Sequence, residues 1–157
     1  AENLLGEEGR GFYGIMETFQ NARICIGGIC AGESAKAIEL TVDYVKTRSA
    51  FGGVLWNQQA IRQKLAMLAS KAAAARQLAY HAAELAEAGQ DCVREVSMVK
   101  ALCPEVLHEV VHGCLQLHGG TGFMTGTPIE RMARDARVLT IGGGATEVML
   151  EEVAKRM

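Results

Sequence analysis

Between about Asn57 and Ala88, apolar residues recur at alternating spacings of four and three, and this periodicity constrains the fold more than any other feature. The positions are Ile61, Leu65, Leu68, Ala72, Ala75, Ala79 and Ala82. Such spacing places the whole set on one stripe of a long α-helix, as at the seam between packed helices. Gly89 follows the last periodic residue, where a left-handed C-cap is expected.

Helical patterns also lie on both sides of this segment. One runs from about Phe12 to Thr47, with a break predicted near Gln20–Asn21, and another begins after Asp91, an expected N-cap, and ends at Gly119. Beyond it the sequence predicts a Gly-rich loop, a short helix at 128–135, an apolar strand-like stretch at 138–141, a triple-glycine turn at 142–144 and a last helix. Three long helices and a C-terminal one predict an all-α fold, an up-down four-helix bundle.

Composition supports a single helical domain. The 157 residues contain two prolines and 5% aromatics, which favours helices over strands, and a chain of this length fits one core. Residues 1–9 are rich in Glu and Gly, and we expect them to be a linker from an upstream domain that is missing here. Residues 10–157 are then the helical domain.

Charge and hydropathy exclude several classes of partner. The net charge is -2 with both signs interspersed, so the clustered basic surface that nucleic acid requires is absent. No apolar run reaches the length of about 18 residues that a membrane span needs, and the N-terminus lacks the pattern of a signal peptide. We therefore expect a soluble, cytoplasmic protein without a membrane span.

Cysteine and histidine spacing gives no sign of a metal site. The cysteines are Cys25, Cys30, Cys92, Cys103 and Cys114. They show no CxxC spacing and lie in apolar helical stretches, so buried, reduced thiols are expected. His108 and His112 form an i, i+4 pair, but no third ligand accompanies them.

The glycines at the end of the third predicted helix are open to two interpretations. Glycine lets the backbone approach a ligand closely, and helix-end amides can hold phosphate oxygens. Taken alone, Gly119-Gly120-Thr121-Gly122 is also explained by a helix cap followed by a loop. It is not a dinucleotide fingerprint, because no strand precedes it and the order of the glycines differs.

Four segments, taken together, make the glycine pattern specific. They are Arg48–Gly52, Gln58–Ile61, Gln116–Phe123 (QLHGGTGF) and Arg134–Ile141. In order and spacing they resemble the C-terminal helical third of the acyl-CoA dehydrogenases, over essentially the whole chain. The resemblance implies a homo-oligomeric flavoprotein, a dimer or tetramer, that uses FAD to oxidise acyl-CoA thioesters by α,β-dehydrogenation. A chain without the other domains is expected to be inactive alone.

The resemblance also implies which residues contact the cofactor. Arg48 and Phe51 would lie at the pyrophosphate and adenine region of FAD in a neighbouring subunit. A guanidinium pairs with phosphate oxygens, and an aromatic ring offers a stacking face. The full set of implied cofactor residues is Arg48, Phe51, Gln59, Gln116, Gly119, Gly120, Thr146 and Glu147. By itself, Arg48 would be interpreted as a solvated helix-end charge, and Thr146-Glu147 as a helix N-terminus.

No catalytic base stands where the resemblance would place one. Many members carry the proton-abstracting Glu at the position of Gly143, and others carry it directly before a conserved Arg, where this chain has Ala22 before Arg23. Glu17 and Glu33 do not share the helical face of Ala22. We therefore predict no catalytic residue within the chain, with Arg23 near the substrate.

Two alternatives to simple dehydrogenation stay open at this point. A member without the Glu would act as a flavin monooxygenase or oxidase, and a purely structural helical oligomerisation module is the non-enzymatic alternative. His118 is expected to be a polar neighbour of the cofactor or of Gln116. Arg134 and Asp135 are expected to form an internal ion pair or cap.

Overall fold

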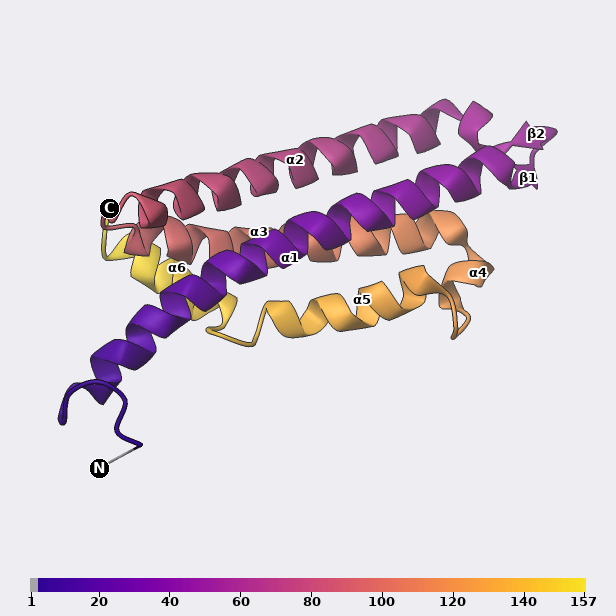
Figure 1. Ribbon diagram of the computed structural model, residues 1–157. Coiled ribbons are helices and arrows are strands. Elements are labelled where there is room, and N and C mark those ends of the chain that lie inside the picture. The colour runs from indigo at the N-terminus through magenta and orange to yellow at the C-terminus, as the bar shows by residue number, and fades with distance from the viewer. Residues whose placement is uncertain (1–2) are drawn as a thin grey trace.

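Three long helices, α1 (Gly11–Thr47), α2 (Gln59–Glu87) and α3 (Val93–His118), run side by side in the computed structural model, which describes residues 3–157 (Figure 1). A hairpin of β1 (Ser49–Ala50) and β2 (Gly53–Val54) and a 3-10 turn, η1 (Leu55–Asn57), join α1 to α2. The chain ends with α4 (Gly120–Phe123), α5 (Pro128–Leu139) and α6 (Thr146–Ala154). The predicted linker, residues 1–9, lies partly outside the described residues.

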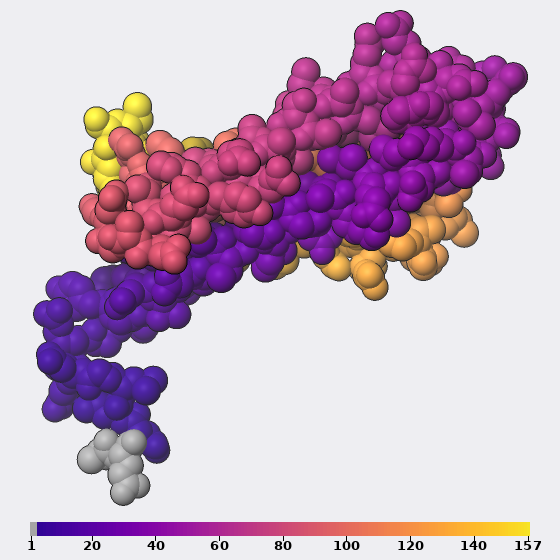
Figure 2. Space-filling view, turned by 45° about the horizontal axis from the view of Figure 1, so that its top comes forward, coloured from indigo at the N-terminus to yellow at the C-terminus, as the bar shows by residue number. Residues whose placement is uncertain are grey.

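The helix directions alternate along the chain, which confirms the predicted all-α, up-down bundle (Figure 1). Two short helices, α5 and α6, occupy the fourth position in succession, and both pack on α3. The helix α3 is central, because it also packs against α1 and α2. The start of α1 projects beyond the other helices (Figure 2).

The apolar stripe of α2 packs as its periodicity predicts. Leu65, Leu68 and Ala79 are buried with Ala75 and Ala82, and the other two members of the set are partly buried against the same core. The opposing residues of α3 are buried at helical spacing as well. They are Val96, Val99, Cys103, Leu107, Val110, Val111 and Cys114. Burial of this one-sided stripe, at about 25 cal/mol per Å² of apolar surface, is the main force that holds the helices together.

Helix ends confirm some expectations and correct others. Gly89 adopts φ +67° and closes α2, as predicted. Asp91 accepts a hydrogen bond from the N–H of Val93 at 3.2 Å, but the cap position itself is Cys92, one residue later. The break predicted near Gln20–Asn21 is wrong, because α1 is continuous there.

The strand-like stretch predicted at 138–141 is also wrong. Val138 and Leu139 form the last turn of α5, and the carbonyl of Val138 accepts hydrogen bonds from the N–H groups of Ile141 and Gly142. The helix extends past residue 135 because its buried face continues at helical spacing through Met132 and Ala136. A run of four apolar residues fits a strand and a helix end equally well.

The cysteines are all free thiols, and four of the five are buried. Burial raises the pKa of Cys30 to about 12 and that of Cys103 to about 11, so these thiols stay protonated near neutral pH. Cys25 departs from the expectation, since it is exposed on α1.

At Gly27, α1 approaches α2 and α3 closely. A Cβ atom there would lie 2.5 Å from Val99 Cγ1 and 2.9 Å from Ala79 Cβ. Gly28, the next residue, has no atom within 4 Å of such a Cβ. Glycine at position 27 is therefore required by packing, and glycine at position 28 is not.

We predict that Gly27→Leu lowers the free energy of unfolding by about 1–3 kcal/mol, because added methylenes would force the helices apart. Gly28→Leu is the matched control. It should raise stability by up to about 1 kcal/mol, because leucine is the better helix former at an open position. Urea unfolding followed by circular dichroism measures both. Equal effects of the two substitutions would contradict this account of the packing.

Candidate cofactor site

A cavity of about 250 Å³ lies at the end of the bundle where α1 and α3 both terminate. Its lining residues are Tyr44, Arg48, Leu55, Gln116, Leu117, His118, Gly119, Gly120 and Thr121. The fold thus brings Arg48 of α1 beside Gln116, Gly119 and Gly120, which lie some seventy residues later in the sequence. Four of the predicted cofactor residues share this cavity.

The three glycines of the QLHGGTGF segment have different structural reasons. Gly119 adopts φ +57° and ends α3, a conformation that other residues rarely adopt. Gly122 packs closely, because a Cβ there would lie 2.7 Å from the carbonyl oxygen of Leu115. Gly120 has neither a positive φ nor any atom within 4 Å of such a Cβ. Nothing in the described chain requires glycine at position 120, which lines the cavity.

His118 connects the wall of the cavity to α1 through contacts with Tyr44 and Thr41. Its ring stacks on Tyr44, with centroids 4.3 Å apart and planes at 18°, and the Tyr44 hydroxyl donates to the carbonyl of His118 at 3.2 Å. Thr41 donates its hydroxyl proton to the carbonyl of Ala37, so the 3.3 Å contact with His118 Nε2 requires that nitrogen to be the donor. Burial lowers the pKa of His118, which favours this neutral form.

Arg48 and Phe51 are both available to a ligand. The Arg48 side chain is exposed and makes no hydrogen bond or ion pair with any residue that the structure describes. Phe51 is 87% exposed and adopts φ +53°, as the first residue of a two-residue hairpin turn completed by Gly52 at φ +78°. A non-glycine residue in this region costs about 1–2 kcal/mol, so the exposed aromatic ring is held by a strained backbone.

The remaining predicted cofactor residues are not part of this cavity. Gln59 is exposed at the first position of α2. Thr146 and Glu147 begin α6, which lies well away from α4 and the cavity (Figure 1). Thr146 donates to Glu105 Oε1 of α3 at 3.1 Å, and Glu105 lies about 20 Å from His118 along the axis of α3, at 1.5 Å per residue.

A turn formed by Gly142, Gly143 and Gly144 precedes α6. Gly143 and Gly144 have φ values of +75° and +121°, and Arg23 Nε donates to the carbonyl of Gly143 at 3.0 Å. Arg23 is only 8% exposed. Ala22 is exposed on α1. Gly143 and Ala22 occupy the two expected base positions, and neither residue carries a carboxylate.

Lys100 is a member of this turn region that our sequence analysis missed. It is fully buried on α3, and its Nζ donates to the carbonyls of Leu139 and Gly144 at 2.8 and 2.7 Å. The available signal was a lysine placed within the apolar stripe of α3. Arg134 pairs with Glu130 one helical turn before it, which corrects the pair predicted with Asp135.

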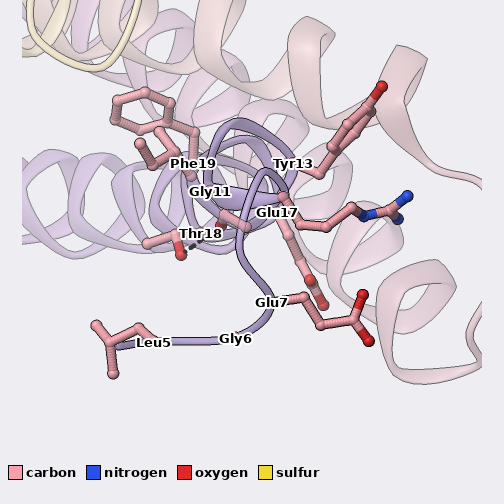
Figure 3. A pocket seen from close by; sticks show the side chains of 11 residues that line it. Leu5, Gly6, Glu7, Gly11, Tyr13, Glu17, Thr18 and Phe19 are labelled. Carbon is pink, nitrogen blue, oxygen red and sulfur yellow. Dashed lines mark hydrogen bonds between the residues drawn. The ribbon is translucent and has the colours of Figure 1, made fainter. Parts of the chain in front are cut away.

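A larger hollow than this cavity lies elsewhere. It has a volume of about 660 Å³ and is lined only by the N-terminal segment and the start of α1, where Leu5, Tyr13 and Phe19 surround it (Figure 3). Glu7 and Glu17 also border it (Figure 3). It contains none of the predicted cofactor residues.

Within residues 3–157, no group of three or more His, Cys, Asp and Glu side chains is arranged to hold a metal ion. His108 and His112 pack ring to ring, with centroids 4.1 Å apart. Over the same residues, no helix is long and apolar enough to span a membrane.

Comparison with known proteins places this arrangement in a family. A sequence profile described as the C-terminal domain of acyl-CoA dehydrogenase matches residues 9–157. The chain belongs to the acyl-CoA dehydrogenase family. This confirms the resemblance of the four sequence segments, and membership in the family implies FAD as the cofactor.

Individual relatives agree with the family assignment. The chain is 42% identical to acryloyl-CoA reductase (NADH) of Anaerotignum propionicum, over 99% of this chain and 41% of that protein. It is 39% identical to an acyl-CoA dehydrogenase of Bacillus subtilis, over 98% of this chain and 40% of that protein. The structure of butyryl-CoA dehydrogenase from Megasphaera elsdenii superposes with a TM-score of 0.95 at 34% identity, over 99% of this chain and 41% of that chain. The chain thus spans about two fifths of the length of these relatives.

We predict that the free energy of unfolding decreases more steeply in the wild type than in His118→Gln when the pH is lowered. Burial lowers the pKa of His118 in the folded state, whereas an unfolded histidine titrates near about 6.5. Its contribution is therefore complete above the unfolded pKa and is lost as the pH falls through the lower, folded pKa. Chemical unfolding between pH 7.5 and 5.5 measures the slope. Leu107→Ala, a buried change without a titratable group, is the control for general destabilisation and should keep the wild-type slope. A steep slope that persists in His118→Gln would contradict the assignment.

Proposed function

We propose that this chain completes the FAD site and helical core of a longer oxidoreductase that oxidises acyl-CoA thioesters between the α and β carbons. The observation that carries the proposal is the convergence of Arg48, Gln116, Gly119 and Gly120 on one cavity. Gly120 gives the strongest support for a bound ligand, because neither packing nor backbone conformation requires glycine there. An open backbone position beside a free guanidinium suits a phosphate-bearing ligand.

Each of these residues has a defined role toward FAD in this proposal. The exposed Arg48 guanidinium pairs with the pyrophosphate, and the exposed ring of Phe51 stacks in the adenine region. The Gln116 amide donates and accepts hydrogen bonds at the adenosine end, where the bare backbone of Gly120 allows close approach. When bound, FAD supplies the acceptor for the hydride that leaves the β carbon. The contacts among His118, Thr41 and Tyr44 hold the wall of the cavity in place.

The cavity and the start of α6 contribute to different copies of the cofactor in this proposal. Thr146 and Glu147 lie about 20 Å from the cavity along α3, so one bundle presents two separate sets of cofactor residues. A homo-oligomer, a dimer or tetramer, allows the cavity end of one subunit to complete a cofactor site of another. An apolar groove of about 370 Å³, lined by Leu78, Met98, Leu102 and Leu150 among others, offers a surface for such packing.

The rest of the organisation is proposed on the same basis. Relatives are more than twice as long as this chain, so we propose that residues 1–9 are a linker and residues 10–157 a helical domain of a longer protein. Large apolar side chains at the start of α1 are exposed, among them Phe12, Tyr13 and Ile15. Further domains would cover them. The chain alone is then expected to be inactive.

A second candidate function follows from Gly143 and Ala22. Without a carboxylate at either position, the protein is a base-less family member that acts as a flavin monooxygenase or oxidase. The similarity to acryloyl-CoA reductase, a protein named for reduction of an acyl-CoA, favours the first proposal, because it retains the thioester substrate class. A purely structural oligomerisation module is the third alternative, and it predicts no flavin binding at all.

We predict that Gly120→Leu weakens FAD binding by the full-length protein at least tenfold, because the side chain would occupy the path of the cofactor. Tenfold corresponds to about 1.4 kcal/mol. The unfolding free energy of the cofactor-free protein should change by less than about 0.5 kcal/mol, as for substitutions at open surface positions. Gly28→Leu makes the same chemical change away from the cavity and should leave the affinity unaltered. Flavin fluorescence titration measures both. An unchanged dissociation constant for Gly120→Leu would remove Gly120 from the cofactor site.

We predict that Ala22→Glu in the full-length protein raises the rate of flavin reduction by an acyl-CoA about 100-fold, the usual contribution of a positioned base. Position 22 is preferred to position 143, because Gly143 has a φ of +75° and any side chain there would be strained. Ala22→Gln is the control, being similar in size but without basicity. Stopped-flow absorbance of the flavin band measures the rate. Equal rates for the Glu and Gln variants would favour the base-less alternative.

A further inference from the structure

Lys100 occupies a position where lysine is seldom found. It lies on α3 between Val96 and Cys103, within the buried stripe, and is 0% exposed. No carboxylate of the described chain forms an ion pair with it. Burying an ammonium group is strongly unfavourable unless it is paired or well hydrogen-bonded. An apolar residue would fill the same place at lower cost, so the fold itself gives no reason for the charge.

The charge of Lys100 is met by main-chain carbonyls instead of a carboxylate. Nζ donates to Leu139 O at 2.8 Å and to Gly144 O at 2.7 Å. Leu139 is the last residue of α5, where the helix dipole presents partial negative charge to a cation. Burial lowers the pKa of Lys100, whereas these charge-assisted bonds favour its protonated form.

Arg23 of α1 acts on the same segment from a second helix. Its Nε donates to Gly143 O at 3.0 Å, between the two carbonyls that Lys100 holds. Two successive residues of the turn have positive φ, and glycine-rich backbone has the greatest freedom to change conformation. The three donated hydrogen bonds therefore restrict the conformation of a turn whose glycines allow many others. The helix α6 begins directly after it, at Thr146.

We propose that Lys100, together with Arg23, is a positioning residue that holds segment 139–147 in its working conformation. The inference rests on the proposed function. This segment contains Gly143, where relatives are expected to carry the base, and Thr146 and Glu147, the predicted cofactor residues at this end. Loss of the clamp frees the turn and the start of α6, so Gly143 and the predicted cofactor residues Thr146 and Glu147 are no longer held in register.

Hydrogen exchange of the cofactor-free protein tests the clamp directly. Lys100→Met keeps the length of the side chain but removes its three donors. Leu107→Ala, a buried change two turns further along α3, is the control for general destabilisation. Once corrected for global stability, amides of 140–147 should exchange at least tenfold faster in Lys100→Met than in Leu107→Ala. Equal exchange in the two variants overturns the proposal.

A second variant covers the case in which Lys100→Met does not fold. Arg23→Gln removes one donor from the same turn and leaves Lys100 in place. It should give a smaller increase in exchange, confined to 140–147. Exchange that rises uniformly over α1 and α3 in this variant would show that Arg23 only stabilises the bundle, and would overturn its part in the clamp.

Kinetics of the full-length protein separate the clamp from the proposed function. Lys100→Met should lower kcat for flavin reduction by acyl-CoA, measured per bound flavin, at least tenfold, because the segment that contains Gly143, Thr146 and Glu147 is no longer held. Leu107→Ala should leave kcat unchanged. Local exchange without a fall in kcat overturns the positioning role. If the wild type itself shows no reduction by any acyl-CoA, the proposed function fails, while the exchange result still decides whether the clamp exists.

Discussion

The packing of α1 against α3 at Gly27 is the contact on which the rest of the structure depends. These two helices supply both parts of the candidate site. Arg23 lies on α1 and Arg48 is its C-cap, whereas Lys100 and Gln116 lie on α3. Because the backbone of α1 meets Val99 at a position without room for a Cβ, the register between the helices is determined by side-chain volume. A small shift of α1 against α3 at Gly27 would move both the cavity and the turn at 142–144, because the two helices are rigid. The bundle thus works as a spacer that holds two sets of polar groups at a constant separation.

The same packing explains which parts of the fold the sequence revealed. The stripe of α2 was predictable because burial on one side imposes a repeat of three and four that hardly any other structure produces. The expected break at Gln20–Asn21 was wrong because two polar residues do not interrupt a helix whose next turns are held by the buried Arg23 and Gly27. The run at 138–141 was misassigned for a related reason. Four residues are too few for a period, so the end of α5 was decided by contacts with α3, which local sequence does not contain.

The candidate site, like the fold, contains residues that the sequence could predict and residues that it could not. Sequence alone treats Gly119, Gly120 and Gly122 as one motif, whereas the structure assigns backbone conformation to the first and close packing to the third. Gly120 meets neither requirement, and its proposed role is toward the cofactor. Lys100 was missed because lysine is almost always placed on the surface, and its partners are carbonyls contributed by α5 and the turn. Main-chain acceptors have no side-chain signature, so no spacing rule would have found them.

The environment of Gly143 bears on where a catalytic base can stand. Two cationic side chains, Lys100 and Arg23, bind the carbonyls around this residue, and a Cβ there would lie 3.8 Å from Lys100 Cε. A carboxylate beside two cations has a lowered pKa, which makes it a weaker base, and the positive φ would add strain. At this turn, both the backbone and the electrostatics therefore disfavour a base. The exposed face of α1 at Ala22 has neither restriction, so a proton-abstracting group is better accommodated there or in a neighbouring domain that faces it.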